Sequence, residues 1–169
     1  MDTETALSFL RSNQPLPPDD ELTEELITQY DEVRKHFIQS PDPRSIPLFL
    51  NSFGLGSGFG IYQLVEDVMT PFSEDEVVPH LVSALEHGSS SVRYWSAQIA
   101  ANFPNDGLID PLQNLLIGDD EDARAAAVTA LERIPSSRVD EILQQALNRE
   151  KSEEVRDLII EAIEDRKNP

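Results

Sequence analysis

The apolar positions in the second half of the chain recur with a fixed period. Under a shift of 31 residues, two sets of apolar positions from three segments coincide: Val77, Leu108 and Val139, and Leu81, Leu112 and Leu143. With the apolar residues three and four places after the second set, each copy shows the spacing i, i+4, i+7, i+8. That spacing is the stripe of an amphipathic helix with one buried face. Each of the three segments is therefore predicted to be a helix.

A second helical stripe lies between the copies of the first. The segments SVRYWSAQIAANF (91–103), DARAAAVTALERI (122–134) and EVRDLIIEAIEDR (154–166) superpose, with Arg93, Arg124 and Arg156 in register. Gly or Pro followed by Ser or Asp separates neighbouring stripes, a combination that ends one helix and caps the next. No segment alternates apolar and polar residues for long enough to predict a strand. The pattern predicts pairs of antiparallel helices, each helix about a dozen residues long.

The helix pairs are predicted to stack, because one pair cannot bury its apolar face alone. We therefore predict an all-α fold, a short α-solenoid of antiparallel helix pairs with about ten helices. The predicted organisation is a single domain over residues 1–169. It comprises atypical cap helices in 1–40, a divergent repeat in 41–73 with a glycine-rich loop at 54–60, and regular repeats in 74–166.

The segments that contain the three arginines share a local pattern. Asp/Glu-x-(Val/Ala)-Arg opens an Ala-rich helix, and a helix of the type DPLQNLL follows; Ser91 stands where an acid is usual. This pattern resembles HEAT repeats of the short bacterial class, the phycobilisome-lyase HEAT-like group, over 74–166 and more loosely over 42–73. The resemblance implies that Arg93, Arg124 and Arg156 form a structural ladder, pairing with acids in the loops of neighbouring repeats.

The glycine-rich loop 54–60 alternates four glycines with other residues ahead of an apolar segment. Its spacing fits neither G-x-G-x-x-G nor G-x-x-x-x-G-K-[ST], and no Lys or Arg occurs from 51 to 92, so we predict no phosphate site. Two interpretations remain. The loop is a joint between helices whose glycines take positive φ, or it is a long rim loop that contacts a partner through Leu55 and Phe59.

The charge of the chain limits its partners. The formal net charge is −19, because 32 Asp and Glu outnumber 13 Lys and Arg. Such a chain repels nucleic acid phosphates and anionic lipid headgroups, and it attracts basic proteins. The sequence holds no cysteine, which excludes disulfides and thiolate metal sites.

The sequence also lacks signals for membrane insertion or export. The first residues, MDTETALSFLRS, are acidic and lack the basic end and long apolar run of a signal peptide. No apolar run approaches the roughly 18 residues that suggest a membrane span. We therefore expect a cytoplasmic protein that contacts neither a membrane nor, directly, nucleic acid.

Histidines and acidic clusters are the remaining candidates for chemistry. His80 and His87 are seven residues apart, unlike the i, i+4 pair of a helical metal site, and His36 lies elsewhere. The acidic run GDDED (118–122) lacks the order of a calcium loop, and its acids are placed to cap the next helix. We predict no catalytic, cofactor or metal site, and hence no enzyme.

The resemblance also implies a binding surface, because in HEAT-like solenoids the second helix of each pair lines the concave face, which usually binds. The outward positions of these helices, together with one residue of the glycine-rich loop and one beside Trp95, form the predicted partner-binding set: Ser83, Glu86, Asp110, Gln113, Asn114, Glu141, Gln144, Gln145, Phe59 and Tyr94. We expect this face to be polar and acidic, without an apolar groove, and to suit a basic protein.

In fold, size and charge the chain resembles HEAT-repeat immunity proteins of polymorphic or contact-dependent toxin systems. That resemblance implies a non-catalytic protein that neutralises a toxin domain, often a basic nuclease, by covering its active surface. The alternative is an adaptor, a scaffold or a chaperone-like regulator of a cellular protein. An inhibitor should bind one partner very tightly, whereas an adaptor can bind several moderately.

Overall fold

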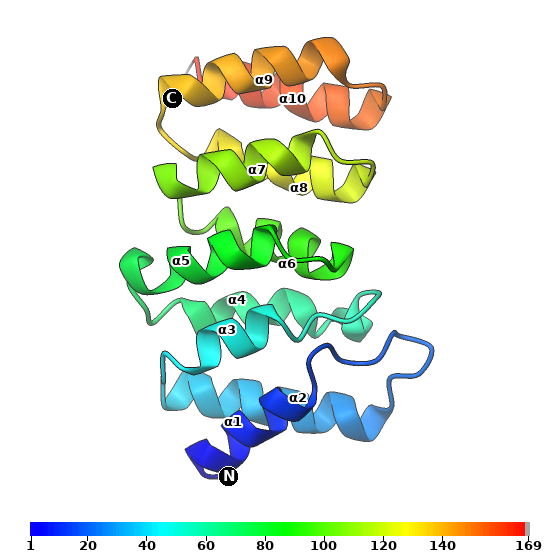
Figure 1. The fold of residues 1–169 in the computed structure, drawn as a ribbon, viewed down its shortest axis with the longest axis vertical. Coiled ribbons are helices and arrows are strands. Elements are labelled where there is room, and N and C mark those ends of the chain that lie inside the picture. The colour runs from blue at the N-terminus through cyan, green and yellow to red at the C-terminus, as the bar shows by residue number, and fades with distance from the viewer. Residues whose placement is uncertain (168–169) are drawn as a thin grey trace. The chain divides into compact units, whose positions relative to one another are not determined.

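All regular secondary structure in the described part of the chain is helical. The computed structural model describes residues 1–167, which form ten α-helices, three short 3₁₀ segments and no strand (Figure 1). This confirms the predicted all-α fold class of the α-solenoid type. Packing groups the chain into two compact units, Met1–His80 (unit 1) and Leu81–Pro169 (unit 2), and the division falls within helix α5 (Glu74–Leu85). The single domain over 1–169 stays a prediction.

Unit 1 contains the irregular N-terminal helices. They are α1 (Thr3–Ser12), α2 (Glu24–Gln39), α3 (Ser45–Leu50) and α4 (Glu66–Met69), with the 3₁₀ segments η1 (Gly58–Gly60) and η2 (Tyr62–Val65), before the first part of α5. The Thr23 hydroxyl caps α2 by accepting a hydrogen bond from the Leu26 amide at 3.2 Å. Within the predicted divergent repeat, the segment 61–72 contains η2 followed by the single turn of α4 in place of one regular helix.

An aromatic cluster forms the core of unit 1. Tyr30 meets Phe49 and Tyr62 edge to face, with ring centroids 5.7 and 6.4 Å apart. The Tyr30 hydroxyl lies 2.7 Å from Ser52 Oγ, which donates to the Phe49 carbonyl, also at 2.7 Å. Burial raises the pKa of Tyr30, so its phenol remains a neutral hydrogen-bond donor. The hydroxyl groups of Tyr30 and Ser52 are therefore paired with each other, and that of Tyr62 accepts a hydrogen bond from the Gly54 amide.

The glycine-rich loop is held by the segment that precedes α2. Asp19 accepts hydrogen bonds from the amides of Ser57 (2.9 Å) and Gly58 (2.8 Å) and from the Ser57 hydroxyl (3.2 Å). The Asp19 amide in turn donates to the Leu55 carbonyl at 3.1 Å. Successive loop amides therefore surround an anion, as in the backbone nests that bind phosphate, but here the anion is the chain's own carboxylate.

Two different features of the structure require glycine in this loop, namely positive φ angles and a close approach of the backbone. Gly56, Gly58 and Gly60 have φ of 109°, 58° and 91°, in the left-handed region that glycine enters without steric cost. Gly54 instead lies against the backbone, because a Cβ atom there would be 2.3 Å from the Leu16 carbonyl oxygen. The loop is thus a closely packed joint within unit 1.

We expect Gly54→Ala to destabilise the protein by about 1–3 kcal/mol, because the new methyl group displaces the Leu16 backbone. Urea unfolding followed by circular dichroism measures this change. Gly88→Ala is the matched control, since a Cβ atom there meets nothing within 4 Å. Its free energy of unfolding should change by less than about 1 kcal/mol. Equal losses in the two variants would contradict the close approach at Gly54.

Unit 2 is built from regular helix pairs. After α5 it contains η3 (Asp106–Leu108) and the helices α6 (Ser90–Ala100), α7 (Ile109–Leu116), α8 (Glu121–Glu132), α9 (Ser137–Arg149) and α10 (Glu153–Asp165). Helix α8 packs on α6 and α10, while α7 and α9 pack on α8 and on each other. Figure 1 shows α7 and α9 facing the viewer, with α8 and α10 behind them. Unit 2 therefore has one layer of α6, α8 and α10 and a second layer that contains α7 and α9.

The loops of unit 2 carry helix caps. The Asp120 carboxylate accepts a hydrogen bond from the Ala123 amide at 3.1 Å, and the Ser152 hydroxyl accepts one from the Val155 amide at 3.4 Å. The remaining acids of 118–122 lie in the first turn of α8 or directly before it, near the positive end of the helix dipole. The acidic run therefore caps a helix, as interpreted from the sequence.

Small side chains let the helices of the first layer approach closely. Ala97, Ala127 and Ala130 are fully buried there. Ser96 of α6 is fully buried as well, and its hydroxyl has no hydrogen-bond partner among the described residues. One period later the same position is Ala127, so a serine occupies an alanine place in the repeat. A buried hydroxyl without a partner costs about 1–3 kcal/mol.

We expect Ser96→Ala to raise the free energy of unfolding by about 1 kcal/mol, because the variant removes a polar group that gains nothing from burial. Calorimetry should show a melting temperature about 2–4 °C higher. Ser52→Ala is the control: that hydroxyl is equally buried but bonded to Tyr30, so its removal should destabilise. Destabilisation by both substitutions would contradict this account of Ser96.

Candidate protein-binding grooves

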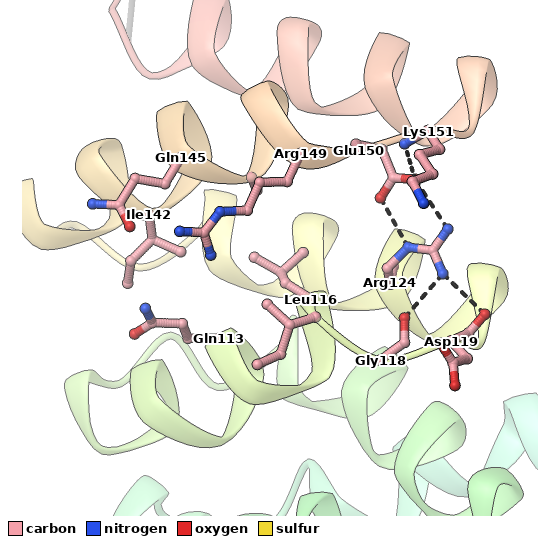
Figure 2. Close-up of a pocket in the computed structure, with 12 residues that line it drawn as sticks. Gln113, Leu116, Gly118, Asp119, Arg124, Ile142, Gln145, Arg149, Glu150 and Lys151 are labelled. Carbon is pink, nitrogen blue, oxygen red and sulfur yellow. Dashed lines mark hydrogen bonds and ion pairs between the residues drawn. The ribbon is translucent and has the colours of Figure 1, made fainter.

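A groove lies between α7 and α9 in the second layer of unit 2. It has a volume of about 550 Å³, and we call it the α7–α9 groove. The two helices and the loops that follow them line it. Figure 2 shows the Arg149 side chain extending along it from the end of α9 toward Ile142, with Leu116 and Gln113 on the opposite wall.

The floor of this groove is apolar. Leu116 and Ile142 are buried, whereas Ile117, directly after the end of α7, is 70% exposed. The amides of Gln113 and Gln145 stand beside them. The face that the sequence predicts to be polar therefore includes apolar side chains at this groove. Ile117 lies outside the 31-residue stripe, so the packing of α7 leaves its side chain in solvent at the groove.

Two cationic side chains flank the groove. Arg149 closes the last turn of α9, and Lys151 follows in the next loop. Both residues are exposed, and within residues 1–167 neither side chain has an ion pair or a hydrogen bond. The α7–α9 groove is thus a local basic site on a strongly acidic chain.

A third cation beside the groove, Arg124, is fixed by its partners. Its guanidinium donates to the two carboxylate oxygens of Glu150 at 2.8 and 3.0 Å, and to the carbonyls of Gly118 (3.1 Å) and Asp119 (3.0 Å). The two side chains are only 14% and 6% exposed. Hydrogen bonds from Arg124, and then from two loop amides, lower the pKa of Glu150 to about 2. The pair joins the loop before α8 to the loop before α10.

The other two arginines of the predicted ladder occupy the equivalent positions but form no ion pair with an acid of residues 1–167. Arg93 donates to the carbonyls of His87 (2.7 Å) and Gly88 (3.0 Å), and Arg156 donates to that of Leu147 (2.8 Å). The expected pairing with acids is therefore corrected at these two places. The residue that corresponds to Glu150 one period before it is Asp119, whose side chain is one methylene shorter, and α10 is the last helix described.

A second groove lies one period earlier, between the end of α5 and α7. It has a volume of about 420 Å³, and we call it the α5–α7 groove. A shift of 31 residues relates most residues that line the two grooves, for example Arg124 to Arg93 and Gln145 to Asn114. Acids are prominent here, because Glu86, Asp119 and Asp120 all line it.

The predicted partner-binding residues of unit 2 divide among these surfaces. Gln113 and Gln145 line the α7–α9 groove, and Glu86 and Asn114 line the α5–α7 groove. Four more residues lie on the exposed surface of the same helices: Ser83, Asp110, Glu141 and Gln144. The Asp110 carboxylate forms an ion pair with Arg138 at the start of α9.

The two predicted aromatic contacts lie away from the grooves. Phe59 is 66% exposed in the glycine-rich loop of unit 1. Tyr94 on α6 is half-buried and meets the Trp95 ring edge to face, with centroids 5.0 Å apart. The sequence reasoning missed Ile117, Arg149 and Lys151. The signal in the sequence was that an apolar residue and two cations stand where the copy one period earlier has Glu86, Gly118 and Asp120.

Clusters of metal-ligating side chains and membrane-spanning helices are both absent from the described residues. Among the described residues, no three His, Cys, Asp or Glu side chains are grouped in a way that could hold a metal ion. Within residues 1–167, every helix is too short or too polar to cross a bilayer.

Comparisons with known proteins find a repeat family and similar solved structures. A family model described as HEAT repeats matches residues 78–164. No curated protein gives a significant match. A crystal structure of computationally designed armadillo repeat proteins for modular peptide recognition is similar with a TM-score of 0.45 and 15% sequence identity. That match covers 95% of this chain and 92% of the designed chain.

We expect the stability difference between the protein and Glu150→Gln to depend on pH. The folded pKa of Glu150 is lowered to about 2, so its stabilisation is present above its ordinary pKa of 4.5 and is lost as pH falls toward 2. Above pH 5 the variant should be less stable by about 2 kcal/mol. Urea unfolding at a series of pH values measures the difference. Glu161→Gln, at an exposed site on α10, is the control. A difference that stays constant down to pH 2 would contradict the Arg124–Glu150 pair.

Proposed function

The chain belongs to the HEAT-repeat family, and from this premise we propose that it is a non-catalytic module that binds a basic protein through the layer of α7 and α9. The observation that carries this proposal is the distribution of charge. The chain has a net charge of −19. Asp110 and Glu141 are exposed on α7 and α9, respectively. A field of this sign raises the association rate with a basic partner and disfavours nucleic acid and anionic membranes.

The more specific form of the proposal is an immunity protein. In that role the chain acts in the bacterial cytoplasm and neutralises a basic toxin domain by covering its active surface. The support is the combination of HEAT repeats, small size and acidic charge in one chain without cysteine. A binding surface that is largely preformed by paired helices suits tight inhibition, because little ordering entropy is lost on binding.

The second candidate is an adaptor or chaperone-like regulator of a cellular protein. It is favoured by the tandem arrangement of the α5–α7 and α7–α9 grooves, since two similar sites one repeat apart suit short segments shared by several partners. The two candidates differ in the number and affinity of their partners. Capture from a host lysate separates them: one stoichiometric basic protein with a toxic activity supports immunity, and several partners released by salt support an adaptor.

We expect Asp110→Lys with Glu141→Lys to weaken binding to the captured basic partner by about tenfold or more, because both changes reverse charge on the proposed face. The melting temperature should hardly change, since the Asp110–Arg138 pair is exposed and such pairs contribute about 0–1 kcal/mol. Isothermal titration calorimetry at low and at physiological salt measures the affinity.

The matched control is Asp157→Lys with Glu161→Lys, which makes the same change in net charge on the exposed surface of α10. Its affinity should fall only slightly at physiological salt, where the screening length is about 8 Å. Equal losses in the two double variants would place the binding surface elsewhere.

A further inference from the structure

The two grooves of unit 2 are lined by equivalent positions of the repeat but differ in charge. Each has a part-buried arginine at its end and a side-chain amide on its wall. Three related positions change character from the α7–α9 groove to the α5–α7 groove: Ile117 to Glu86, Arg149 to Gly118, and Lys151 to Asp120. Three cations, Arg124, Arg149 and Lys151, outnumber Asp119 and Glu150 along the α7–α9 groove, which also has an exposed apolar residue. Along the α5–α7 groove the acids Glu86, Asp119 and Asp120 outnumber Arg93.

Building on the proposed function, we propose that the two grooves bind one extended segment of the partner protein. An acidic side chain of that segment occupies the α7–α9 groove, and a basic side chain occupies the α5–α7 groove.

The α7–α9 groove offers donors that the fold leaves unused. The side chains of Arg149 and Lys151 have no partner within residues 1–167, and a carboxylate would give them charge-assisted hydrogen bonds. The side-chain amides of Gln113 and Gln145 supply further donors on the wall. Ile117 offers an apolar contact for the stem of the bound side chain. A basic side chain would instead face two unpaired cations.

The α5–α7 groove offers the opposite charge. Glu86 and Asp119 are exposed, and within the described part of the chain their carboxylates have neither an ion pair nor a hydrogen bond. The Asp120 carboxylate caps α8 but still adds its charge. Arg93 is occupied by two backbone carbonyls, so it takes less part in the chemistry of this groove.

The distance between the grooves sets the spacing of the two side chains. Packed helices lie about 8–10 Å apart, so equivalent places on successive pairs are separated by about that distance. An extended chain advances about 3.3 Å per residue. The acidic and basic side chains should therefore stand about three residues apart in the segment.

Charge also decides between a foreign segment and a second copy of this chain. Two copies, each with a net charge of −19, repel each other before either groove is reached. A basic partner is attracted as a whole, and its acidic residue then fixes the position of the segment.

The test is the double variant Arg149→Glu with Lys151→Glu, measured against the captured partner by calorimetry. The variant makes the chain more acidic, so long-range attraction alone would strengthen binding to a basic protein. We expect binding to weaken by about tenfold or more, because the carboxylate of the partner loses its donors. Arg11→Glu with Arg133→Glu is the matched control, since both arginines are exposed outside the grooves. It should bind at least as tightly as the unchanged protein.

A double variant at Arg149 and Lys151 that binds as tightly as its control would overturn the proposal, even if Asp110 and Glu141 prove essential. Failure of the proposed function has a different signature, namely that no basic partner is captured.

In that case, NMR titration with short capped peptides tests the inference about the grooves. The peptides carry Asp and Lys three residues apart, in both orders. The mixed peptides should shift the amide signals of Gln145 and Asn114, and a peptide with two Lys should shift that of Asn114 alone. Equal shifts at Gln145 from the two-Lys peptide, or no shift from any peptide at millimolar concentration, would overturn the inference.

Discussion

Each helix pair of unit 2 has to be covered by a neighbouring pair, and most features of this unit follow from that requirement. Leu112 and Leu143 occupy equivalent places and are both fully buried. Alanines in α6 and α8 let the helices of the first layer pack closely. Because burial of apolar surface is the dominant favourable contribution to folding, any copy of the repeat that lost this pattern would expose the face of its neighbour.

The same requirement orders the loops that border the grooves. A helix end leaves carbonyl groups without intrahelical partners, and the chain after it turns away from the helix. In each repeat of unit 2 an arginine binds backbone carbonyls at this place. Arg124 donates to two carbonyls of the loop after α7, those of Gly118 and Asp119, and also binds Glu150 in the loop after α9. The backbone around each groove is therefore fixed by the fold, while Ile117 is exposed and the Arg149 side chain has no ion pair or hydrogen bond within residues 1–167, so the fold limits their identity less. A repeat protein can in this way vary the side chains that contact a partner without changing its backbone.

This division explains how much could be predicted from the sequence. The all-α repeat was predictable because each helix shows its buried face in its own residues, and the shift of 31 then relates the copies. The hydrogen bond that Asp19 accepts from the Ser57 amide could not be predicted, because it joins residues 38 positions apart and produces no periodic pattern in the sequence. The α7–α9 groove was missed for a related reason. The pattern indicates that Ile117 and Arg149 are exposed, but their proximity depends on how α9 packs on α7.

The basic side chains of the chain show why the α7–α9 groove stands out. Many of the 13 have structural partners: six form ion pairs with acids, and Arg93 and Arg156 bind backbone carbonyls. Arg149 and Lys151 have no such role in the described part of the chain, yet they line the same groove. The total charge attracts any basic protein and falls off over a screening length of about 8 Å at physiological salt. It therefore cannot distinguish one basic partner from another. Discrimination requires contacts at hydrogen-bond distance, and the local reversal of charge in this groove supplies a contact that a uniformly acidic surface would lack.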